Sequence, residues 1–146
     1  MTAPGIGHRL VFMTAAAQYL RPDWLTRHVL NPLVRALGAA TTLEVVRRRT
    51  GETQRIPVNV LESGGRRYLV SARGETEWVR NLRASSHCTL RRRGRQAGYR
   101  ATELPISERP AVIAEYRARW DSQVRRFFEQ LPEPAAHPVF RLEPAD

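Results

Sequence analysis

The hydrophobic pattern of the chain changes its period near residue 40, and this change decides what kind of domain can form. Before that point apolar residues recur at helical spacing, which predicts N-terminal helices within residues 1–40. From there to residue 104, apolar and polar residues alternate in short segments bounded by turn residues. Strands are therefore expected over residues 42–48, 54–61, 67–72, 87–92 and 97–104.

Turn residues between these segments predict antiparallel hairpins. Thr50 and Gly51 separate the first two strands, residues 63–65 (Ser-Gly-Gly) the next two, and Gly94 the last two. In a flat sheet, the unpaired backbone groups of the two edge strands would be exposed to pairing with other chains. We therefore expect a mostly antiparallel sheet that closes, or nearly closes, into a small barrel within residues 41–104.

One helix is expected between the predicted strands in the sequence, and another follows them. Trp78, Val79 and Leu82 lie at helical spacing and predict a short helix over residues 77–84. A long helix is expected within residues 107–131, with Ser107 as its N-cap. Its apolar stripe consists of Val112, Tyr116, Trp120, Val124, Phe127, Phe128 and Leu131.

A last strand is expected within residues 138–143. The 146 residues are one domain's length, so residues 1–146 are expected to form a single domain. The predicted fold class is α+β, mainly β, with about six strands. The N-terminal helices and the long C-terminal helix are expected to pack outside the barrel.

The positive charge is concentrated in the middle of the chain. The net charge is +10, and residues 47–100 hold 14 arginines against four glutamates. A localised positive field favours an anionic partner. Nucleic acid, an anionic lipid surface and a phosphorylated or polycarboxylate ligand all fit this charge.

Several kinds of active site are disfavoured by residues that the chain lacks. The sequence contains no glycine-rich phosphate loop, no cysteine cluster and no paired histidines at metal spacing, so no metal site is expected. The single cysteine, Cys88, is expected to be a small core or edge residue. No side chain is assigned as catalytic.

The N-terminal segment bears on the location of the protein. No apolar run reaches the ~18–20 residues of a membrane span. Residues 10–20 predict an amphipathic helix that is a candidate for peripheral membrane contact, with a weak signal peptide as the alternative. A chain with one cysteine fits a reducing compartment, so a cytoplasmic location is expected, with membrane association left open.

Two clusters of residues have the chemistry of a ligand site. Arg47, Arg48, Arg49, Thr50 and Gly51 lie at a predicted turn, where backbone N–H groups, a hydroxyl and guanidinium groups suit a phosphate. A solvated hairpin tip is the alternative.

The second cluster follows the third predicted strand. Gly74 allows close approach of a ligand to the backbone after Arg73, Trp78 offers a stacking face, and Asn81 offers a donor and an acceptor. The alternative is that Trp78 simply anchors the short helix to the core.

These clusters resemble the motifs of a known family. Residues 48–57, which include Arg55, Ile56 and Pro57, are similar to the "GRKSG…R-x-P" segment of the deazaflavin (F420)-dependent nitroreductases and quinone reductases. Residues 70–74 resemble that family's "ASKGG" stretch, and residues 78–84 its "WYxNLxAxP" segment. Residues 137–140 resemble its closing "IPV" strand. The similarity spans about residues 24–144.

The resemblance implies a split β-barrel that binds coenzyme F420 in a groove, with FMN as the alternative cofactor. The Arg48–Gly51 turn and Arg55 would hold the cofactor's phosphate, Gln54–Asn59 would run along the ring, and Arg73 would meet the acidic tail. The implied cofactor-binding residues are Arg48, Arg49, Thr50, Gly51, Gln54, Arg55, Ile56, Pro57, Val58, Asn59, Val70, Ser71, Ala72, Arg73, Trp78, Val79, Arg80 and Asn81.

The resemblance also implies hydride transfer to a small planar acceptor, such as a quinone, a nitroaromatic or an activated enone. Trp24, Phe127 and Phe128 are candidates for the acceptor's apolar wall, and ordinary packing of the long helix is the alternative for the two phenylalanines. A non-catalytic binder of F420 or lipid, an FMN-binding barrel and a basic nucleic-acid-binding module remain open. So does the choice between monomer and homodimer.

Overall fold

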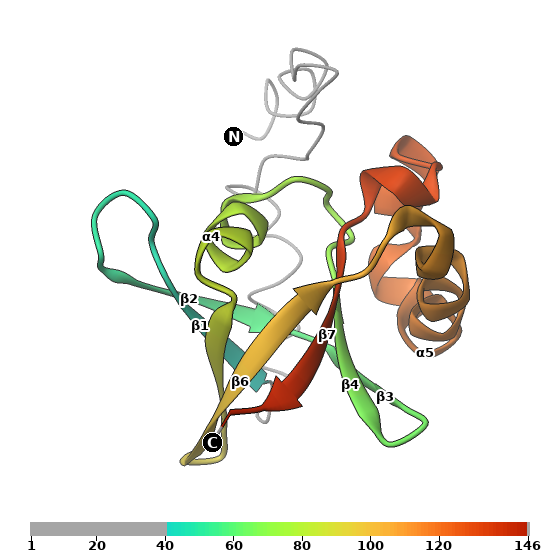
Figure 1. Cartoon of the computed structure of the whole chain (residues 1–146). Helices are drawn as coiled ribbons and strands as arrows, with labels where there is room; N and C mark the ends of the chain where they lie inside the picture. Colours follow the sequence, from blue (N-terminus) through green and yellow to red (C-terminus); the bar gives the residue numbers. More distant parts are fainter. Residues whose placement is uncertain (1–40, 146) are drawn as a thin grey trace, which may run out of the picture.

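The computed structural model describes residues 41–145 (Figure 1). The predicted N-terminal helices, residues 10–20 among them, lie outside the described residues. The strands are β1 (Thr41–Val46), β2 (Thr53–Val58), β3 (Val60–Ser63), β4 (Arg66–Val70), β5 (His87–Arg92), β6 (Arg95–Glu103) and β7 (Val139–Pro144). The helices are α4 (Glu77–Ser85) and α5 (Arg109–Gln130), with short 3-10 turns η3 (Ile106–Glu108) and η4 (Pro134–Ala136).

The strands form a single curled sheet, in which every pairing is antiparallel. Their order is β2-β1-β5-β6-β7-β4-β3, so β2 and β3 lie at opposite edges although only Asn59 separates them in the chain. The two edges must therefore approach each other, which bends the sheet into a half-barrel (Figure 1). This confirms the predicted mainly β, split-barrel class.

The expected single strand over residues 54–61 was wrong, because it is two strands with different partners. In β2, Val58 pairs with Thr41 of β1, whereas Val60 in β3 pairs with Leu69 of β4. Ile56, Val58 and Val60 all pack against the same core cluster, so alternation continues through the break. The chain changes partner at Asn59 to close the barrel.

Two hairpins turn where the glycine pattern predicts. Gly64 and Gly65 have φ values of 59° and 77°, and they connect β3 to β4. Arg93 and Gly94, with φ values of 52° and 79°, connect β5 to β6. Positive φ at both central residues is the signature of the two-residue turn that matches strand twist.

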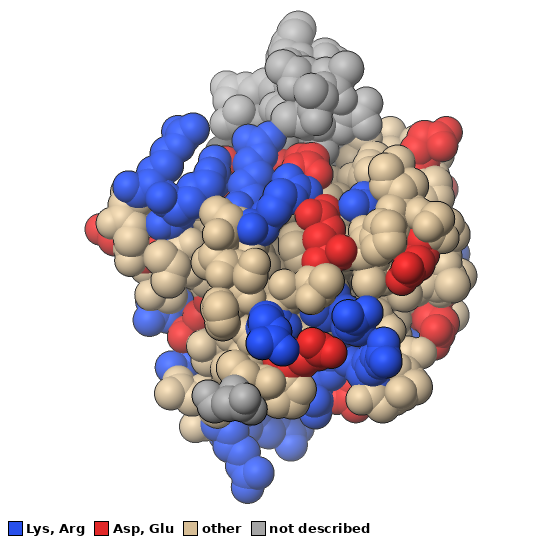
Figure 2. All heavy atoms as spheres, viewed as in Figure 1, with Lys and Arg blue, Asp and Glu red and all other residues tan. Residues whose placement is uncertain are grey.

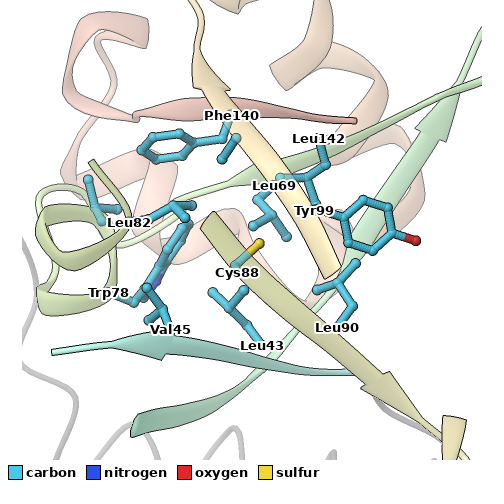
Figure 3. Close-up of a cluster of buried hydrophobic side chains, with 12 residues drawn as sticks. Leu43, Val45, Leu69, Trp78, Leu82, Cys88, Leu90, Tyr99, Phe140 and Leu142 are labelled. Atoms are coloured by element: carbon cyan, nitrogen blue, oxygen red, sulfur yellow. The ribbon is translucent and has the colours of Figure 1, made fainter. Parts of the chain in front are cut away.

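The predicted short helix is present as α4, which covers one face of the sheet. Its buried residues include Trp78, Val79 and Leu82. Figure 3 shows Trp78 and Leu82 pointing from α4 toward the side chains of the strands. Trp78 packs against Phe140 of β7, with ring centroids 6.0 Å apart. The apolar face of α4 therefore fixes this helix to the barrel.

The long predicted helix is present as α5, but Ser107 is not its N-cap. Ser107 lies inside η3, and Glu108 occupies the capping position without a side-chain bond. Pro110 lies in the first turn of α5, where its fixed φ and missing N–H are tolerated, and this sets the start of the helix. The helix kinks at Trp120, whose φ and ψ are −126° and 23°. The predicted apolar stripe of α5 packs on the barrel, and Val112 and Trp120 are its half-buried members.

The last strand is central rather than peripheral. β7 lies between β6 and β4, and His137 holds the chain where it enters this strand. The His137 side chain is fully buried, with Nδ1 2.9 Å from the Ser71 carbonyl oxygen and Nε2 2.6 Å from the Leu131 carbonyl oxygen. These contacts tie the end of β4 and the end of α5 to the start of β7.

Candidate functional site

The tip of the β1–β2 hairpin is fastened to α4 by Asn81. The Asn81 Oδ1 atom accepts hydrogen bonds from the Arg48 backbone N–H at 3.0 Å and from Arg48 Nη1 at 2.8 Å. Asn81 Nδ2 donates to Gln54 Oε1 at 2.8 Å. Arg48 Nη1 also lies 2.9 Å from Glu77 Oε1. Residues from both sequence clusters thus meet at one point.

The hairpin tip itself is an exposed, cationic turn. Gly51 has a φ of 81°, and its N–H donates to the Arg47 carbonyl at 2.9 Å. Thr50 Oγ1 accepts from the Glu52 N–H at 3.2 Å. Within residues 41–145, no carboxylate pairs with Arg47 or Arg49. Two exposed guanidinium groups therefore remain for an anion at this turn.

The surface around the tip is strongly positive. Figure 2 shows basic side chains gathered over the β1–β2 hairpin and α4, at the upper left of the view. Asn81 is only 2% exposed, so it lies beneath this surface. An anion at the tip would meet the arginines, while Asn81 would hold the loop that carries them.

The β2 strand extends from this tip along one edge of the sheet. Ile56, Pro57 and Val58 are half-buried, and Pro57 lies on the edge strand, where its missing N–H is tolerated. Arg55 donates through Nε to Glu44 Oε2 at 3.1 Å. Glu44 also accepts from Arg91 Nε at 2.9 Å, and this bond lowers the pKa of the Glu44 carboxyl. The structure thus ties Arg55 to a carboxylate, unlike Arg49.

The segment after β4 forms a tight turn held by Ser71. The Ser71 N–H donates to the Pro138 carbonyl at 2.9 Å, and its hydroxyl donates to the Gly74 carbonyl at 2.5 Å. Gly74 has a φ of 90°, which favours glycine. Val70 and Ser71 are buried, while Ala72 and Arg73 are half-buried. The buried pair therefore shapes the turn rather than its surface.

Arg73 points into the molecule, toward α5. Its Nη1 atom is buried, and its positive charge acts on Tyr116. Burial raises the pKa of Tyr116 to about 12, although a hydrogen bond with Asn59 and the Arg73 charge act in the opposite direction. Asn59 Nδ2 also donates to Gln123 Oε1 at 3.1 Å. Two predicted site residues thus meet α5 at the strand break.

Sequence reasoning missed Tyr116 and Gln123 as partners of this region. The sequence pattern places Tyr116 in the apolar stripe of the long helix, and its side chain is indeed buried. The available signal is that a tyrosine in an apolar stripe needs a partner for its hydroxyl. Gln123 lies outside the stripe and carries no such signal.

Other predicted site residues belong to the core in this structure. Trp78 and Val79 are buried in the α4 face, and Arg80 is half-buried with Nη1 3.9 Å from Glu77 Oε2. Phe127 and Phe128 are 2% and 5% exposed. Phe128 stacks on His137 at 4.1 Å between ring centroids. Trp24 lies outside the described residues, so the predicted acceptor wall stays a prediction.

The remaining reactive groups of residues 41–145 do not form a metal site. Among residues 41–145, no three His, Cys, Asp or Glu side chains are placed to hold a metal ion. Burial raises the pKa of the Cys88 thiol to about 12, which disfavours the nucleophilic thiolate. No helix in this part of the chain is long and apolar enough to span a bilayer.

Similar solved structures share the fold. A protein of unknown function from Agrobacterium tumefaciens aligns with a TM-score of 0.59 at 20% identity, over 75% of this chain and 50% of that chain. An F420 reductase aligns with a TM-score of 0.52 at 14% identity, over 74% and 87%. A FAD-binding protein from Mesorhizobium loti aligns with a TM-score of 0.51 at 16% identity, over 74% and 82%. This chain therefore spans half the length of the Agrobacterium protein.

The family comparison is the most specific. A search of curated proteins gives no match. The model of the F420H2-dependent quinone reductase family matches residues 21–129, a span that contains the β1–β2 tip, the turn after β4 and α4. The chain therefore belongs to the F420H2-dependent quinone reductase family, whose members are oxidoreductases that depend on coenzyme F420.

Proposed function

We propose that this protein reduces an electrophilic, planar acceptor, such as a quinone, a nitroaromatic or an activated enone, with reduced coenzyme F420. The observation that carries the proposal is the contact of Arg48 and Gln54 with Asn81, which joins the β1–β2 tip to α4. These segments are the ones whose motifs resemble the deazaflavin-dependent reductases. Their meeting in space is independent of that resemblance.

The exposed groups of the region fit a phosphate-bearing, planar cofactor. Arg49, Thr50 and Gly51 would hold its phosphate, because the tip carries exposed guanidinium groups on a turn fixed by backbone bonds. Arg48, which is bonded to Asn81 and Glu77, would contribute its charge and position the turn. The edge of β2, residues 54–59, would lie along the ring. When bound, coenzyme F420 supplies the hydride.

The buried residues of the region would position these groups. Asn81 holds the tip, Ser71 holds the turn after β4, and Trp78 and Val79 fix α4 to the barrel. Rigid support of this kind orients a cofactor and excludes water from its face. The half-buried Ala72 and Arg80 would complete the wall around the ring and tail, while Val70 and Arg73 would support the turn from within. No acid or base of the chain is assigned to the transfer.

Binding is tested first by fluorescence titration of the full chain with oxidised coenzyme F420, beside FMN. Arg49→Ala removes one exposed guanidinium from the tip, and we expect about tenfold weaker binding of F420. Arg126→Ala is the matched control, because it removes one exposed arginine from α5, away from the tip. Its affinity should match that of the unmodified protein.

Turnover is tested separately by following oxidation of reduced F420 with a naphthoquinone, a nitroaromatic and an enone. Reduction of at least one acceptor supports the proposed activity. Tight F420 binding with no acceptor reduced would make this chain a non-catalytic binder. Binding of FMN but not F420 would overturn the assignment of the cofactor.

A further inference from the structure

A second positively charged region lies at the other end of the barrel. A groove of about 1080 Å³ opens between the β2–β3 junction, the β5–β6 hairpin and the kink of α5. Among the residues that the structure describes, its lining includes five arginines and a single carboxylate, that of Glu62. The arginines are Arg67, Arg92, Arg93, Arg95 and Arg119. Figure 2 shows basic side chains at the lower end of the view, where the β5–β6 hairpin lies in Figure 1.

Most of this charge has no counterion among residues 41–145. Glu62 pairs with Arg67 at 3.5 Å. Across the part of the chain that the structure describes, no carboxylate pairs with Arg92, Arg93 or Arg95. The groove therefore carries a large excess of positive charge on its open side.

The hairpin places like charges against one another, which a purely structural role does not require. Arg92 and Arg95 are direct cross-strand partners in β5 and β6, and like charges in such a position destabilise a hairpin. Arg93 adopts a φ of 52° at the turn, a conformation that glycine adopts with less strain. The fold would be served better by a carboxylate at position 92 and a glycine at position 93.

Two other arginines of the groove are held in place by aromatic rings. The Arg119 guanidinium lies 4.7 Å from the ring centroid of Trp120, at the kink of α5. The Arg67 guanidinium lies 5.7 Å from the ring centroid of Tyr99. Figure 3 shows the Tyr99 hydroxyl pointing away from the core cluster. Guanidinium groups fixed in this way lose less freedom when they bind an oxyanion.

We propose that this groove binds a small molecule that carries several phosphate groups. Guanidinium groups on two strands and a helix suit several linked phosphates better than one anion. The concave shape favours a small ligand over a flat membrane or a wide duplex. The groove contains Thr41, at the opposite end of β1 from the hairpin tip, so its arginines are separate from the proposed cofactor-phosphate site. Val58 and Asn59, which are proposed to lie along the cofactor ring, also line the groove, so the two sites adjoin at the end of β2.

The proposal is tested by calorimetric titration of the full chain with inorganic tripolyphosphate at low salt. We expect saturable binding of one equivalent, and at least tenfold weaker binding by Arg92→Glu. Arg126→Glu, with the same charge change on α5, should stay within twofold of the unmodified protein. Arg92→Glu should unfold at an equal or higher temperature, because a carboxylate opposite Arg95 replaces repulsion with attraction.

Arg93→Gly provides a second variant that preserves the turn and removes one charge. It should also weaken tripolyphosphate binding severalfold, and neither hairpin variant should change the affinity for coenzyme F420. The proposal is overturned if tripolyphosphate does not bind, if Arg126→Glu weakens it as much as Arg92→Glu, or if Arg49→Ala alone abolishes it. Preference for a DNA duplex over tripolyphosphate, lost in Arg92→Glu, would also overturn it.

Discussion

Asn81 should be the residue on which the position of the β1–β2 tip depends most. Its side chain is 2% exposed and forms three hydrogen bonds, two with Arg48 and one with Gln54. Asn81→Ala removes all three and leaves the Arg48 N–H and the Gln54 amide without this partner. Because Asn81 links segments 33 residues apart, its loss should free the whole tip from α4.

The size of the effect follows from these bonds. Each is worth about 1 kcal/mol, and the bond from the guanidinium somewhat more. The Arg48 side chain is 24% exposed, so hydrogen bonds with water replace part of what is lost. The higher helix propensity of alanine in α4 offsets about 0.5 kcal/mol more. We expect a loss of about 2–3 kcal/mol, or roughly 8–10 °C in Tm for a chain of this length.

Asn81→Asp is the matched control. It keeps the acceptor for Arg48 and the size of the side chain, and the Gln54 amide can rotate so that its nitrogen donates. Its loss should stay below about 1 kcal/mol.

Urea unfolding of the full chain measures both variants, and hydrogen exchange reports the Arg48 N–H directly. Exchange of this amide should be faster in Asn81→Ala and unchanged in Asn81→Asp. The reasoning is refuted if Asn81→Ala costs less than 1 kcal/mol, or if the two variants lose equal stability.

Three further changes test other parts of the fold. Arg109→Met removes a buried guanidinium that donates to two backbone carbonyls and to Glu103, and it should cost about 3 kcal/mol by urea unfolding; a loss below 1 kcal/mol would contradict this. Burial lowers the pKa of His137 and outweighs the opposite effect of the Leu131 and Ser71 carbonyl oxygens, so the unfolded chain binds the proton more readily. Stability should therefore fall as pH drops below about 6.5 toward the folded-state pKa, and His137→Gln should lose less stability between pH 7.5 and 5.0; equal losses would count against the buried, neutral histidine. Gly65→Ala forces alanine to a φ of 77° and should lower the free energy of unfolding by about 1 kcal/mol, while Gly98→Ala, whose Cβ meets only Ala145 Cβ at 3.8 Å, should change it by less than half as much.

The elements that sequence predicts well are those fixed by local chemistry. The Gly64–Gly65 turn and α4 follow from residues that are neighbours in the chain. The strand break at Asn59 leaves no trace in the pattern, because Ile56, Val58 and Val60 keep alternating across it. Closure of the barrel imposes that break, and closure is a property of all seven strands. The central place of β7 is likewise set by strand pairing that spacing does not encode.

The candidate site divides in the same way. The two motif clusters are visible in the sequence, but the bond between Arg48 and Asn81 joins them only in the folded chain. Arginines at similar positions along β2 and its tip also differ in a way that sequence does not reveal. Arg55 is tied to Glu44, whereas Arg49 has no carboxylate partner in the described part of the chain. Whether a guanidinium group is available for a ligand depends on the carboxylates that other strands bring near it.

The excess of arginine therefore resolves into two separate positive ends. Arg83 and Arg109 share Glu103 inside the fold, while Arg49 at one hairpin tip and Arg92 at the other have no such partner among residues 41–145. The two tips lie toward opposite ends of β1, whose six residues span about 20 Å. This exceeds the screening length of about 8 Å at physiological salt, so each end should bind its anion independently. In a variant that combines Arg49→Ala with Arg92→Glu, the affinity for coenzyme F420 should equal that of Arg49→Ala alone, and the affinity for tripolyphosphate should equal that of Arg92→Glu alone. A larger loss of either affinity in the combined variant would show that the two fields act as one.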